Sequence, residues 1–504
     1  MRVLAYSNRG PASGARPVSA AQSFVALARK SSAVTRQPSK RPFASRHRAN
    51  GTAAADSYAQ QEQLIEWLAT AGGDTITGKI ALRPSRHGLV ATKQLSKGEV
   101  VLSVPQNLWI TKEAAGAEGL THLLEHFEPW LAIAIGLMVG KARAARSGKC
   151  TTAIERYAES LPLDHGSPVA WSSEELEMLQ GTQLLTSVQA YNTFYEAKYT
   201  QLKAELFDLH PEIFTPPSAF TFDAFVWAVS TVRSRAHSPL DGRDFALVPV
   251  ADLVSHARGS SCNVQWTIKQ KGVMGFGREK VLVVETTRAI PQGETLAMDY
   301  GPQKTEGQIL LDHGCLDGLQ APGTFALTVT LPSDDRFFDD KIDILEQAGL
   351  QESNEFIVRS DNPPPEGMLA TLRLVNIQGP DAFLLESIFR NEVWDHMQLP
   401  ISEDNERAVC QSMVDGCDAV LSGYPSPGLS LNATESNGTR ESIAAAISLG
   451  EREALERIAR YFQGRLDQLS NLEYYAERRL KRLGLLDKEG KPTDWDGFFE
   501  DGIA

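Results

Sequence analysis

Cysteine is scarce in this 504-residue sequence, and its five copies stand far apart with no CxxC pair: Cys150, Cys262, Cys315, Cys410 and Cys417. Zinc sites and disulfide frameworks draw on cysteines at short, repeated spacings, so we expect neither a metal site nor a disulfide-stabilised fold. Scattered free thiols are typical of a protein that works in a reducing interior.

Long apolar runs are lacking as well. The longest extends from Trp130 to Val139, whereas a helix that spans a bilayer needs about 20 predominantly apolar residues. The sequence therefore predicts a soluble protein without a membrane-spanning segment.

Acidic residues are absent before Asp56, and the 55 residues ahead of it hold ten Lys and Arg among many Ser and Ala. This composition is typical of an organelle transit peptide, and it lacks the apolar centre of a secretory signal. From Asp56 onward the balance reverses, with 40 basic and 63 acidic residues and a net charge of −23. Because nucleic-acid binding requires clustered Lys and Arg to neutralise phosphates, we expect a protein partner and no nucleic acid.

Two similar hairpin patterns stand about 200 residues apart in the chain. Residues Gly88 to Ile110 alternate apolar and polar side chains around the turn SKGE, and Glu285 to Gly301 repeat this pattern around PQGE. Alternation on either side of a glycine-containing turn predicts a pair of strands. We expect both hairpins to belong to one system of small sheets.

Helical periodicity dominates the rest of the first half of the chain. One helix is predicted over residues 58–71, and further helices form an insertion at about 112–231 between the two hairpins. Within the insertion, Pro129 predicts a break between two helices. Ser172 or Ser173, each followed three residues later by Glu, predicts a capped helix start.

The character of the chain changes after Gly314. Thr324 to Pro332 predicts one last strand, and helical patterns follow, ending in a long helix from about Ser442. This helix carries one apolar stripe, which we attribute to packing on a neighbouring helix: Leu455, Ile458, Phe462, Leu466 and Leu469. An exposed loop is predicted at 423–442, and we attribute its two glycosylation-like sequons, at Asn432 and Asn437, to chance.

Polar residues interrupt two apolar segments in a way that indicates a functional site. Asp252, Ser255 and His256 follow the apolar run VPVA, interpreted as a buried strand, and Tyr300 ends another short strand before Gly301-Pro302. Taken singly, each has a structural explanation, and a buried ion pair between Asp252 and Arg235 is as good an interpretation as a site. A Ser-His-Asp hydrolase is disfavoured because neighbours on an extended chain point to opposite faces, and no nucleophile-elbow sequence occurs.

Several segments carry a resemblance to a known family. RSRAHS (233–238), VPVADLVSHA (248–257), the strand that ends in Tyr300 and ILLDHG (309–314) resemble the signature segments of SET-domain protein-lysine methyltransferases. WSSEELEMLQGTQLL, FFDDKIDILEQAG, DAFLLESIFRNEVWDHMQLPISEDNE and LEYYAERRLKRLGL resemble, more narrowly, the chloroplast methyltransferases of the Rubisco large subunit. The likeness extends from about Gln60 to Phe499.

The resemblance implies an α+β fold in two parts. Residues 56–320 would form a SET domain of small β-sheets with the helical insertion at 112–231, and residues 321–504 an all-α domain that binds the substrate. Residues 1–55 would be a chloroplast transit peptide that directs the chain to the stroma, with the mitochondrion as the alternative destination.

The resemblance also implies an activity. Such an enzyme transfers a methyl group from S-adenosylmethionine to a lysine amine of a folded protein, here the Rubisco large subunit or a stromal enzyme such as fructose-bisphosphate aldolase. No metal is needed, because the acceptor amine attacks the methyl carbon directly and the sulfur leaves as a neutral thioether.

The family's site residues can be carried over to matching positions. Tyr300 would be the catalytic residue, at the meeting point of cofactor and lysine. The implied cofactor-binding residues are Ser85, Arg86, His87, Arg235, Ser255, His256, Trp266 and Tyr300. The implied substrate-binding residues are Arg235, His237, Asp252, Tyr300 and His313.

Four positions depart from the family pattern. Ser255 stands in place of an Asn, His237 in place of an aromatic residue, Pro239 in place of an Arg and His313 in place of a Tyr. Pro239 cannot supply the charge of an arginine. These departures motivate an alternative hypothesis, a catalytically weak or inactive SET-fold scaffold that binds a protein partner.

Overall fold

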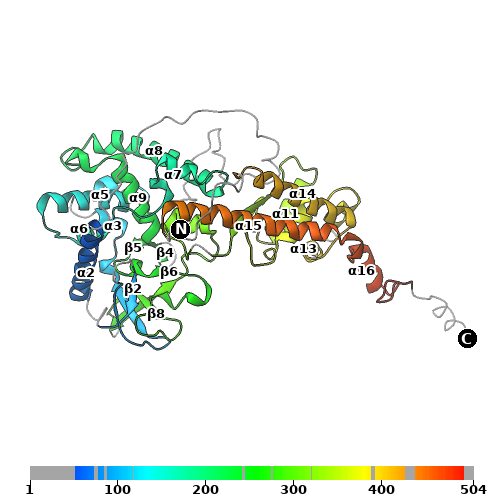
Figure 1. Ribbon diagram of the computed structural model, residues 1–504, viewed down its shortest axis with the longest axis horizontal. Helices are drawn as coiled ribbons and strands as arrows, with labels where there is room; N and C mark the ends of the chain where they lie inside the picture. Colours follow the sequence, from blue (N-terminus) through cyan, green and yellow to red (C-terminus); the bar gives the residue numbers. More distant parts are fainter. Residues whose placement is uncertain are drawn as a thin grey trace, which may run out of the picture. The chain divides into compact units, whose positions relative to one another are not determined.

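The computed structural model describes residues 52–72, 78–83, 88–116, 119–240, 244–273, 276–318, 321–386, 392–425 and 438–492. The expected leader lies outside these residues up to position 51, as do Ser85, Arg86, His87 and both sequons. Two compact units divide the chain (Figure 1): the first holds the described residues up to Glu177 and from Leu184 to Gly318, and the second holds Met178–Gln183 and those from Ala321 onward. The domain limits inferred from the sequence, 56–320 and 321–504, stay predictions.

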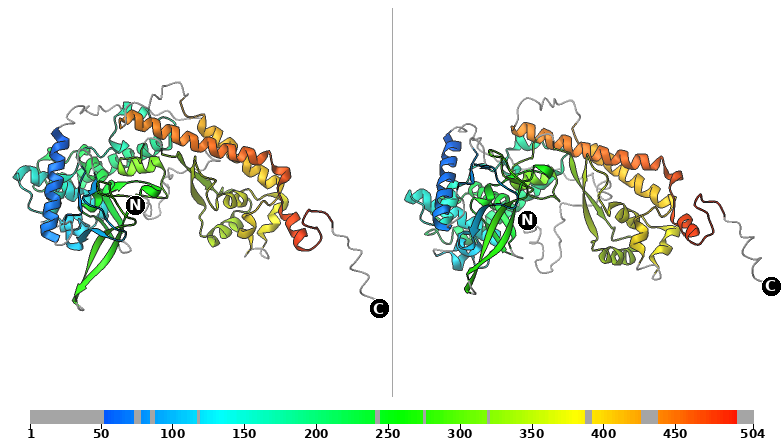
Figure 2. Two further views of the ribbon diagram at one scale, coloured as in Figure 1. Left: turned by 60° about the horizontal axis from the view of Figure 1, so that its bottom comes forward. Right: turned by 90° about the horizontal axis from the view of Figure 1, so that it is seen from below.

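The first unit contains several small sheets, as expected. Strand β8 lies in the centre of a three-stranded antiparallel sheet between β3 and β7, and β7 and β8 continue as a long two-stranded ribbon (Figure 2). Two shorter antiparallel pairs accompany it, β1 with β2 and β4 with β5. The bounds are β1 Ile80–Leu82, β2 Leu89–Ala91, β3 Val100–Pro105, β4 Ala236–Leu240, β5 Asp244–Leu247, β7 Val264–Val273 and β8 Phe276–Thr286.

The two segments pair with each other, which confirms that they belong together, but neither forms the expected hairpin, because β2 pairs with β1 and β3 with β8. Besides the pairing of β3 with β8, Leu95 and Ile290 exchange backbone hydrogen bonds of 2.9 and 3.0 Å. Each predicted hairpin turn places its glycine at positive φ, +77° at Gly98 and +84° at Gly293, a conformation that glycine adopts without steric cost. Local turn chemistry thus brings together segments that are distant in sequence.

The segment that follows β5 differs from the expected buried strand. Val248 and Val250 are fully buried, but neither is in a strand: Val250 lies in a turn with a φ of 70°, and Val248 directly precedes that turn. A 3-10 helix at Ala251–Leu253 and strand β6, Ser255–His256, come next. Burial was therefore predicted correctly, but the strand was wrong, because a short apolar run does not distinguish a strand from a tightly packed turn.

Helices fill the insertion between β3 and β4. The break at Pro129 is confirmed, since α4 ends at Leu124 and α5 begins at Pro129. The capping box at Ser172 is also confirmed, because its hydroxyl accepts from the Glu175 backbone and the Glu175 carboxylate from the Ser172 backbone. The bounds are α2 Thr52–Gly72 ahead of the insertion, then α3 Lys112–Gly116, α4 Thr121–Leu124, α5 Pro129–Ser147, α6 Ala153–Ser160, α7 Ser173–Glu177, α8 Gln183–Leu202 and α9 Phe222–Arg235.

Helix α5 is the centre of this helical layer and is apolar over most of its circumference. Its residues 130–140 are all buried, and α3, α6 and α9 pack around it (Figure 1). Burial on all sides explains why its sequence shows a continuous apolar run instead of a stripe. Because α9 packs on this rigid helix, the side chains at its C-terminal end occupy fixed positions.

Helix α10, Glu306–His313, closes the first unit and follows Tyr300 by a short turn. Its start is fixed by a capping box between Thr305 and Gln308, and it ends at Gly314 with φ +69°. A β-carbon on Gly314 would lie 1.7 Å from the carbonyl oxygen of His165. Glycine is therefore required here by a backbone contact as well as by its φ.

The second unit corrects the expectation of an all-α domain. Strand β10, Thr324–Thr330, was anticipated, but it pairs in antiparallel fashion with a second strand, β11, Ser353–Arg359. Helix α11 separates the two strands in sequence, so no hairpin turn marks the pair, and only Phe356 and Val358 of β11 are buried. A short, half-polar strand among helical segments gives a weak sequence signal.

The expected apolar stripe of the long C-terminal helix is confirmed as a packing surface. Leu455, Ile458 and Phe462 of α15 are buried in a core shared with α14 and with β10 and β11. Helix α15 runs alongside α14 (Figure 2). The helices of this unit are α11 Phe338–Gln347, α12 Met368–Val375, α13 Val393–Met397, α14 Glu403–Leu421, α15 Arg440–Leu466 and α16 Tyr475–Arg482.

The described part of the chain holds neither a candidate metal site nor a helix that could span a membrane. No group of three or more His, Cys, Asp or Glu side chains within it could hold a metal ion. None of its helices is long and apolar enough to cross a membrane.

Candidate active site

A pair of two-residue parallel strands brings His256 and Tyr300 together. Strand β6 pairs with β9, Ala297–Met298, and Tyr300 follows two residues after β9. The Tyr300 backbone N–H donates to Nδ1 of His256 at 3.3 Å, and the two rings lie 5.0 Å apart between centroids. The predicted proximity of the two residues is confirmed, although they are 44 positions apart in sequence.

The proton positions on both rings follow from these contacts. Because Nδ1 of His256 accepts a hydrogen bond, the proton of the neutral ring is on Nε2. Burial, followed by the charge of Arg258, lowers the pKa of His256, so the neutral form is favoured. The Tyr300 hydroxyl donates to the Val254 carbonyl, and burial raises its pKa well above the usual value. Tyr300 is therefore a neutral phenol whose oxygen can only accept from a further group.

Arg235 and Asp252 form a buried ion pair next to this pair of rings. Arg235 Nη1 donates to Asp252 Oδ2 at 2.9 Å, and the hydroxyl of the buried Tyr157 donates to the same oxygen at 2.7 Å. The side chain of Asp252 is only 1% exposed. The prediction of a buried ion pair between Arg235 and Asp252 is thus confirmed.

The same ion pair also retains unused hydrogen-bonding capacity. Among the described residues, Arg235 Nε and Asp252 Oδ1 are buried and have no hydrogen-bond partner. Buried polar atoms without a partner cost about 1–3 kcal/mol each, so native proteins rarely keep them unless a ligand or water completes the site. An unpaired donor and an unpaired acceptor, next to each other, indicate a polar ligand.

His313 borders Tyr300 on another side. Its ring centroid is 4.5 Å from that of Tyr300, and its Nδ1 lies 2.9 Å from the Ser234 carbonyl. A carbonyl only accepts, so Nδ1 carries the proton and Nε2 accepts from Lys304 Nζ at 3.3 Å. Burial lowers the pKa of His313 to about 3, and the charge of Lys304 contributes to this shift.

His237 and Trp266 lie together, as the substrate and cofactor assignments require. Their rings meet edge to face with centroids 5.5 Å apart. His237 is 6% exposed, and burial lowers its pKa to about 4, so it is a neutral imidazole. No contact recorded for Trp266 reaches Tyr300, so its role beside the cofactor stays a prediction.

Ser255 lies against Gly88, the residue directly before strand β2. A β-carbon on Gly88 would be 2.5 Å from Ser255 Oγ, and Gly88 has a φ of +126°. The expected cofactor-binding residues Ser85, Arg86 and His87 precede this glycine directly and lie outside the described residues. The structure therefore shows that Gly88 lies close to Ser255, and the roles of the three preceding residues stay predictions.

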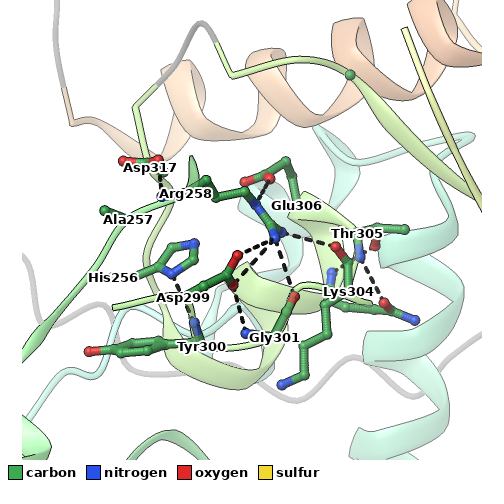
Figure 3. A network of polar contacts seen from close by, with 12 residues as sticks. His256, Ala257, Arg258, Asp299, Tyr300, Gly301, Lys304, Thr305, Glu306 and Asp317 are labelled. Atoms are coloured by element: carbon green, nitrogen blue, oxygen red, sulfur yellow. Dashed lines mark hydrogen bonds and ion pairs between the residues drawn. The ribbon is translucent and has the colours of Figure 1, made fainter. Parts of the chain in front are cut away.

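Sequence reasoning missed several residues that hold the site together. Tyr157 comes from helix α6, 95 positions from its partner Asp252, and no motif marks it. Arg258 connects the end of β6 to the residues around Tyr300 (Figure 3). Asp312 binds both Arg233 and Lys304, at 2.5 and 2.6 Å. The sequence signal of Arg258 and Asp312 was only that of charged residues close to apolar motifs.

Comparison with known proteins shows which family has this sequence and fold. The SET domain family matches residues 86–301, and the family described as Rubisco LSMT substrate-binding matches residues 332–455. The chloroplastic [fructose-bisphosphate aldolase]-lysine N-methyltransferase of Arabidopsis thaliana is 34% identical over 438 residues, which cover 86% of this chain and 89% of that protein. The chain belongs to the SET-domain family of protein-lysine N-methyltransferases.

Further relatives and solved structures of this family are similar to the chain over most of its length. The chloroplastic Rubisco large subunit N-methyltransferase of Nicotiana tabacum is 34% identical, with 86% of this chain and 87% of that protein covered. The solved SET domain of LSMT bound to lysine and AdoHcy superposes with a TM-score of 0.72 at 31% identity, covering 86% and 97% of the two chains. The structure of Rubisco LSMT bound to AdoMet gives a TM-score of 0.67 at 30% identity, covering 86% and 98%.

Three of the four expected departures from the family pattern have described side chains. The His237 ring contacts Trp266, His313 contacts Tyr300 and the Ser234 carbonyl, and Ser255 Oγ lies where it would meet a β-carbon on Gly88. Pro239 belongs to strand β4, two residues after His237. His313 therefore offers a polar ring beside Tyr300.

Proposed function

We propose that this SET-family enzyme transfers a methyl group from S-adenosylmethionine to the side-chain amine of a lysine on a folded stromal protein, the Rubisco large subunit or fructose-bisphosphate aldolase. One observation carries the proposal: Tyr300 and His256 meet beside a buried ion pair that keeps an unused donor and an unused acceptor. The two candidate substrates are those in the names of relatives that are 34% identical to this chain.

The residues present fit the cofactor. Arg235 Nε is a buried donor suited to a carboxylate, and Asp252 Oδ1 is a buried acceptor suited to an ammonium group. Both groups occur on the amino-acid end of S-adenosylmethionine. Gly88 leaves no room for a side chain beside Ser255, as expected where backbone approaches a ligand closely. When bound, the cofactor supplies an electrophilic methyl group on a positively charged sulfur.

The protein must keep the acceptor amine uncharged. A lysine with a pKa near 10.4 pays about 4–5 kcal/mol to be neutral at pH 7, and burial beside apolar and aromatic groups reduces this cost by disfavouring the ammonium form. The rings of Tyr300, His256 and His313 supply such surroundings, and both imidazoles are neutral. Neutral neighbours shield the amine from water without fixing a proton on it.

Tyr300 is the proposed catalytic residue. Its hydroxyl proton is engaged with the Val254 carbonyl, so the phenol oxygen presents lone pairs. An oriented oxygen dipole stabilises positive charge that moves from sulfur to nitrogen, and such fixed dipoles are worth several kcal/mol in a site that excludes water. Burial keeps the phenol protonated, because it raises the pKa of Tyr300.

The proposal is tested by incubating the recombinant chain from residue 52 with labelled S-adenosylmethionine and, separately, purified Rubisco, purified aldolase and stromal extract. We expect one labelled protein, with the methyl group on lysine by mass spectrometry, and loss of about 100-fold in kcat in Tyr300→Phe. Binding of S-adenosylmethionine by calorimetry, lost in Arg235→Ala, would support a cofactor site. Absence of label on every protein would leave the scaffold alternative.

The destination in the stroma is part of the proposal. Its support is the basic, acid-free leader and the chloroplastic relatives. Fusion of residues 1–60 to a fluorescent protein should direct the fusion to chloroplasts. Fluorescence confined to mitochondria would reject the stromal assignment.

A further inference from the structure

The guanidinium of Arg258 binds the turn that carries Tyr300 at several points (Figure 3). Nη1 donates to the Gly301 carbonyl at 3.2 Å, and Nη2 donates to the Lys304 carbonyl at 2.9 Å. Nε donates to Glu306 Oε1 at 2.8 Å, at the start of α10. Nη1 also lies 3.5 Å from both carboxylate oxygens of Asp299. All three guanidinium nitrogens are therefore engaged.

Arg258 contacts the residues on both sides of Tyr300 in the sequence. Asp299 precedes it and Gly301 follows it, and both bind Arg258. The turn has a single internal backbone hydrogen bond, from the Lys304 N–H to the Gly301 carbonyl at 3.0 Å, and is neither helix nor strand. A segment with so little regular structure depends on side chains to fix its conformation. Arg258 supplies contacts at both of its ends.

Arg258 is itself anchored next to His256. It follows β6 by two residues, and its backbone N–H donates to Asp317 Oδ2 at 2.7 Å. Its side chain is 15% exposed and faces the carboxylates of Asp299 and Glu306. The residue thus spans from the strand that holds His256 to the turn that holds Tyr300.

A guanidinium suits this position better than an ammonium. Arginine presents five N–H donors in a fixed plane and can reach several acceptors in different directions at once. A lysine would keep the positive charge among the carboxylates but would donate from one atom only. The comparison between the two side chains therefore separates charge from geometry.

We propose that Arg258 is a positioning residue for Tyr300: it holds the turn 299–304 so that the phenol oxygen stays fixed against the Val254 carbonyl in the methyl-transfer site. This inference rests on the proposed function. A purely structural interpretation, in which the cluster only stabilises the fold, predicts a lower unfolding temperature with unchanged kcat in the folded enzyme.

The test compares Arg258→Ala and Arg258→Lys with a control, Arg288→Ala. Arg288 belongs to the same unit and pairs with Glu294 at 2.5 Å. Both residues precede β9 in sequence, whereas the turn 299–304 follows it. We expect kcat to fall at least tenfold in Arg258→Ala and at least fivefold in Arg258→Lys, with KM for the protein substrate changed less than twofold. Arg288→Ala should stay within twofold of the wild type in both.

Hydrogen exchange gives a readout that needs no activity. Without any ligand, the backbone amides of Tyr300, Gly301, Gln303 and Lys304 should exchange at least tenfold faster in Arg258→Ala than in the wild type, and no faster in Arg288→Ala. If Arg258→Ala does not fold, Glu306→Gln removes the charge at one of the contacts and should raise exchange and lower kcat by two- to fivefold.

The outcomes are distinct. A wild-type kcat in Arg258→Lys would reject the geometric role of the guanidinium. If both hydrogen exchange and kcat were unchanged in Arg258→Ala, the proposal would be rejected altogether. Where Arg258→Ala does not fold, the same result in Glu306→Gln would reject it. A wild-type chain that methylates nothing would defeat the proposed function and with it the catalytic consequence, while hydrogen exchange would still decide whether Arg258 orders the turn.

Discussion

The imidazole of His313 lies against the ring of Tyr300, 4.5 Å between centroids, with one nitrogen donating to the Ser234 carbonyl and the other accepting from Lys304. This arrangement fixes the tautomer and the orientation of the imidazole. Because Ser234 belongs to α9 and His313 ends α10, the contact also connects two helices at the site. His313 is therefore more than a polar substitute for the tyrosine of the family pattern.

Replacing His313 by Phe should keep the ring contact and remove both hydrogen bonds. We expect kcat to fall about tenfold, since Tyr300 would lose a fixed neighbour and the Ser234 carbonyl would lose its partner, a loss of about 1–3 kcal/mol in stability. Steady-state kinetics and the unfolding midpoint in urea measure the two effects. His210→Phe is the control, because His210 Nδ1 contacts the exposed Glu212 at 3.4 Å in the same unit. Equal kcat in both variants would contradict the prediction.

The stability of the enzyme should depend on pH through His237. Its pKa is lowered from 6.5 to about 4 by burial, so the unfolded chain binds the proton more readily than the folded chain. Stability from this group is therefore fully present above pH 6.5 and is lost as the pH falls towards 4, by about 3 kcal/mol. Urea midpoints at pH 7.5, 6.0 and 5.0 measure the loss. His237→Phe should flatten this dependence, and identical pH profiles for both proteins would refute the assignment.

Local signals explain what the sequence predicted about the fold. The two predicted hairpin segments each carry alternation and a turn glycine, Gly98 or Gly293, at positive φ, so their association was inferred correctly. The hairpins themselves were wrong, because each turn's flanking strands pair with strands from elsewhere in the chain. Pro129 marked a helix start through its fixed φ, and Ser172 marked one through its side-chain hydroxyl. Strand β11 was missed because its partner lies beyond a helix, and the pairing energy comes from a contact that no short window contains.

The residues of the site also fall into those that local sequence signals reveal and those that only the fold reveals. Tyr300, His256, Arg235 and Asp252 were found because they stand inside recognisable segments, and the structure brings them together. Tyr157 could not be found, because it contacts Asp252 from a helix 95 positions away and its own segment resembles an ordinary amphipathic helix. Residues that support a site from another element become visible only when the chain is folded.

Removing the charge of Asp252 should damage both stability and cofactor binding. In Asp252→Asn the buried guanidinium of Arg235 loses its counter-ion, and breaking a buried pair on one side costs about 3–5 kcal/mol. Tyr157→Phe removes only one hydrogen bond to the same carboxylate and should cost about 1 kcal/mol. Urea unfolding ranks the two, and calorimetry with S-adenosylmethionine should show weaker binding in Asp252→Asn. A larger loss in Tyr157→Phe would mean that the ion pair is not the main element.

Gly88 should tolerate no side chain, for two separable reasons. Its φ of +126° disfavours any L-residue, and an added β-carbon would lie 2.5 Å from Ser255 Oγ. We expect Gly88→Ala to lower stability by about 1–3 kcal/mol and to weaken S-adenosylmethionine binding, since the turn ahead of β2 would shift. Gly98→Ala is the matched control for backbone strain, because Gly98 has a φ of +77° and nothing within 4 Å of an added β-carbon.

Adding Ser255→Ala to Gly88→Ala separates the steric contact from the strain. Removal of the hydroxyl eliminates the 2.5 Å contact and leaves the Ser255 β-carbon at 3.9 Å, an ordinary van der Waals distance. The double variant should therefore recover part of the lost stability and settle near the cost measured for Gly98→Ala. Full recovery would show that φ at Gly88 costs nothing. No recovery would show that Ser255 is not the group that an added methyl meets, and the close approach of this turn to β6 would have to be abandoned.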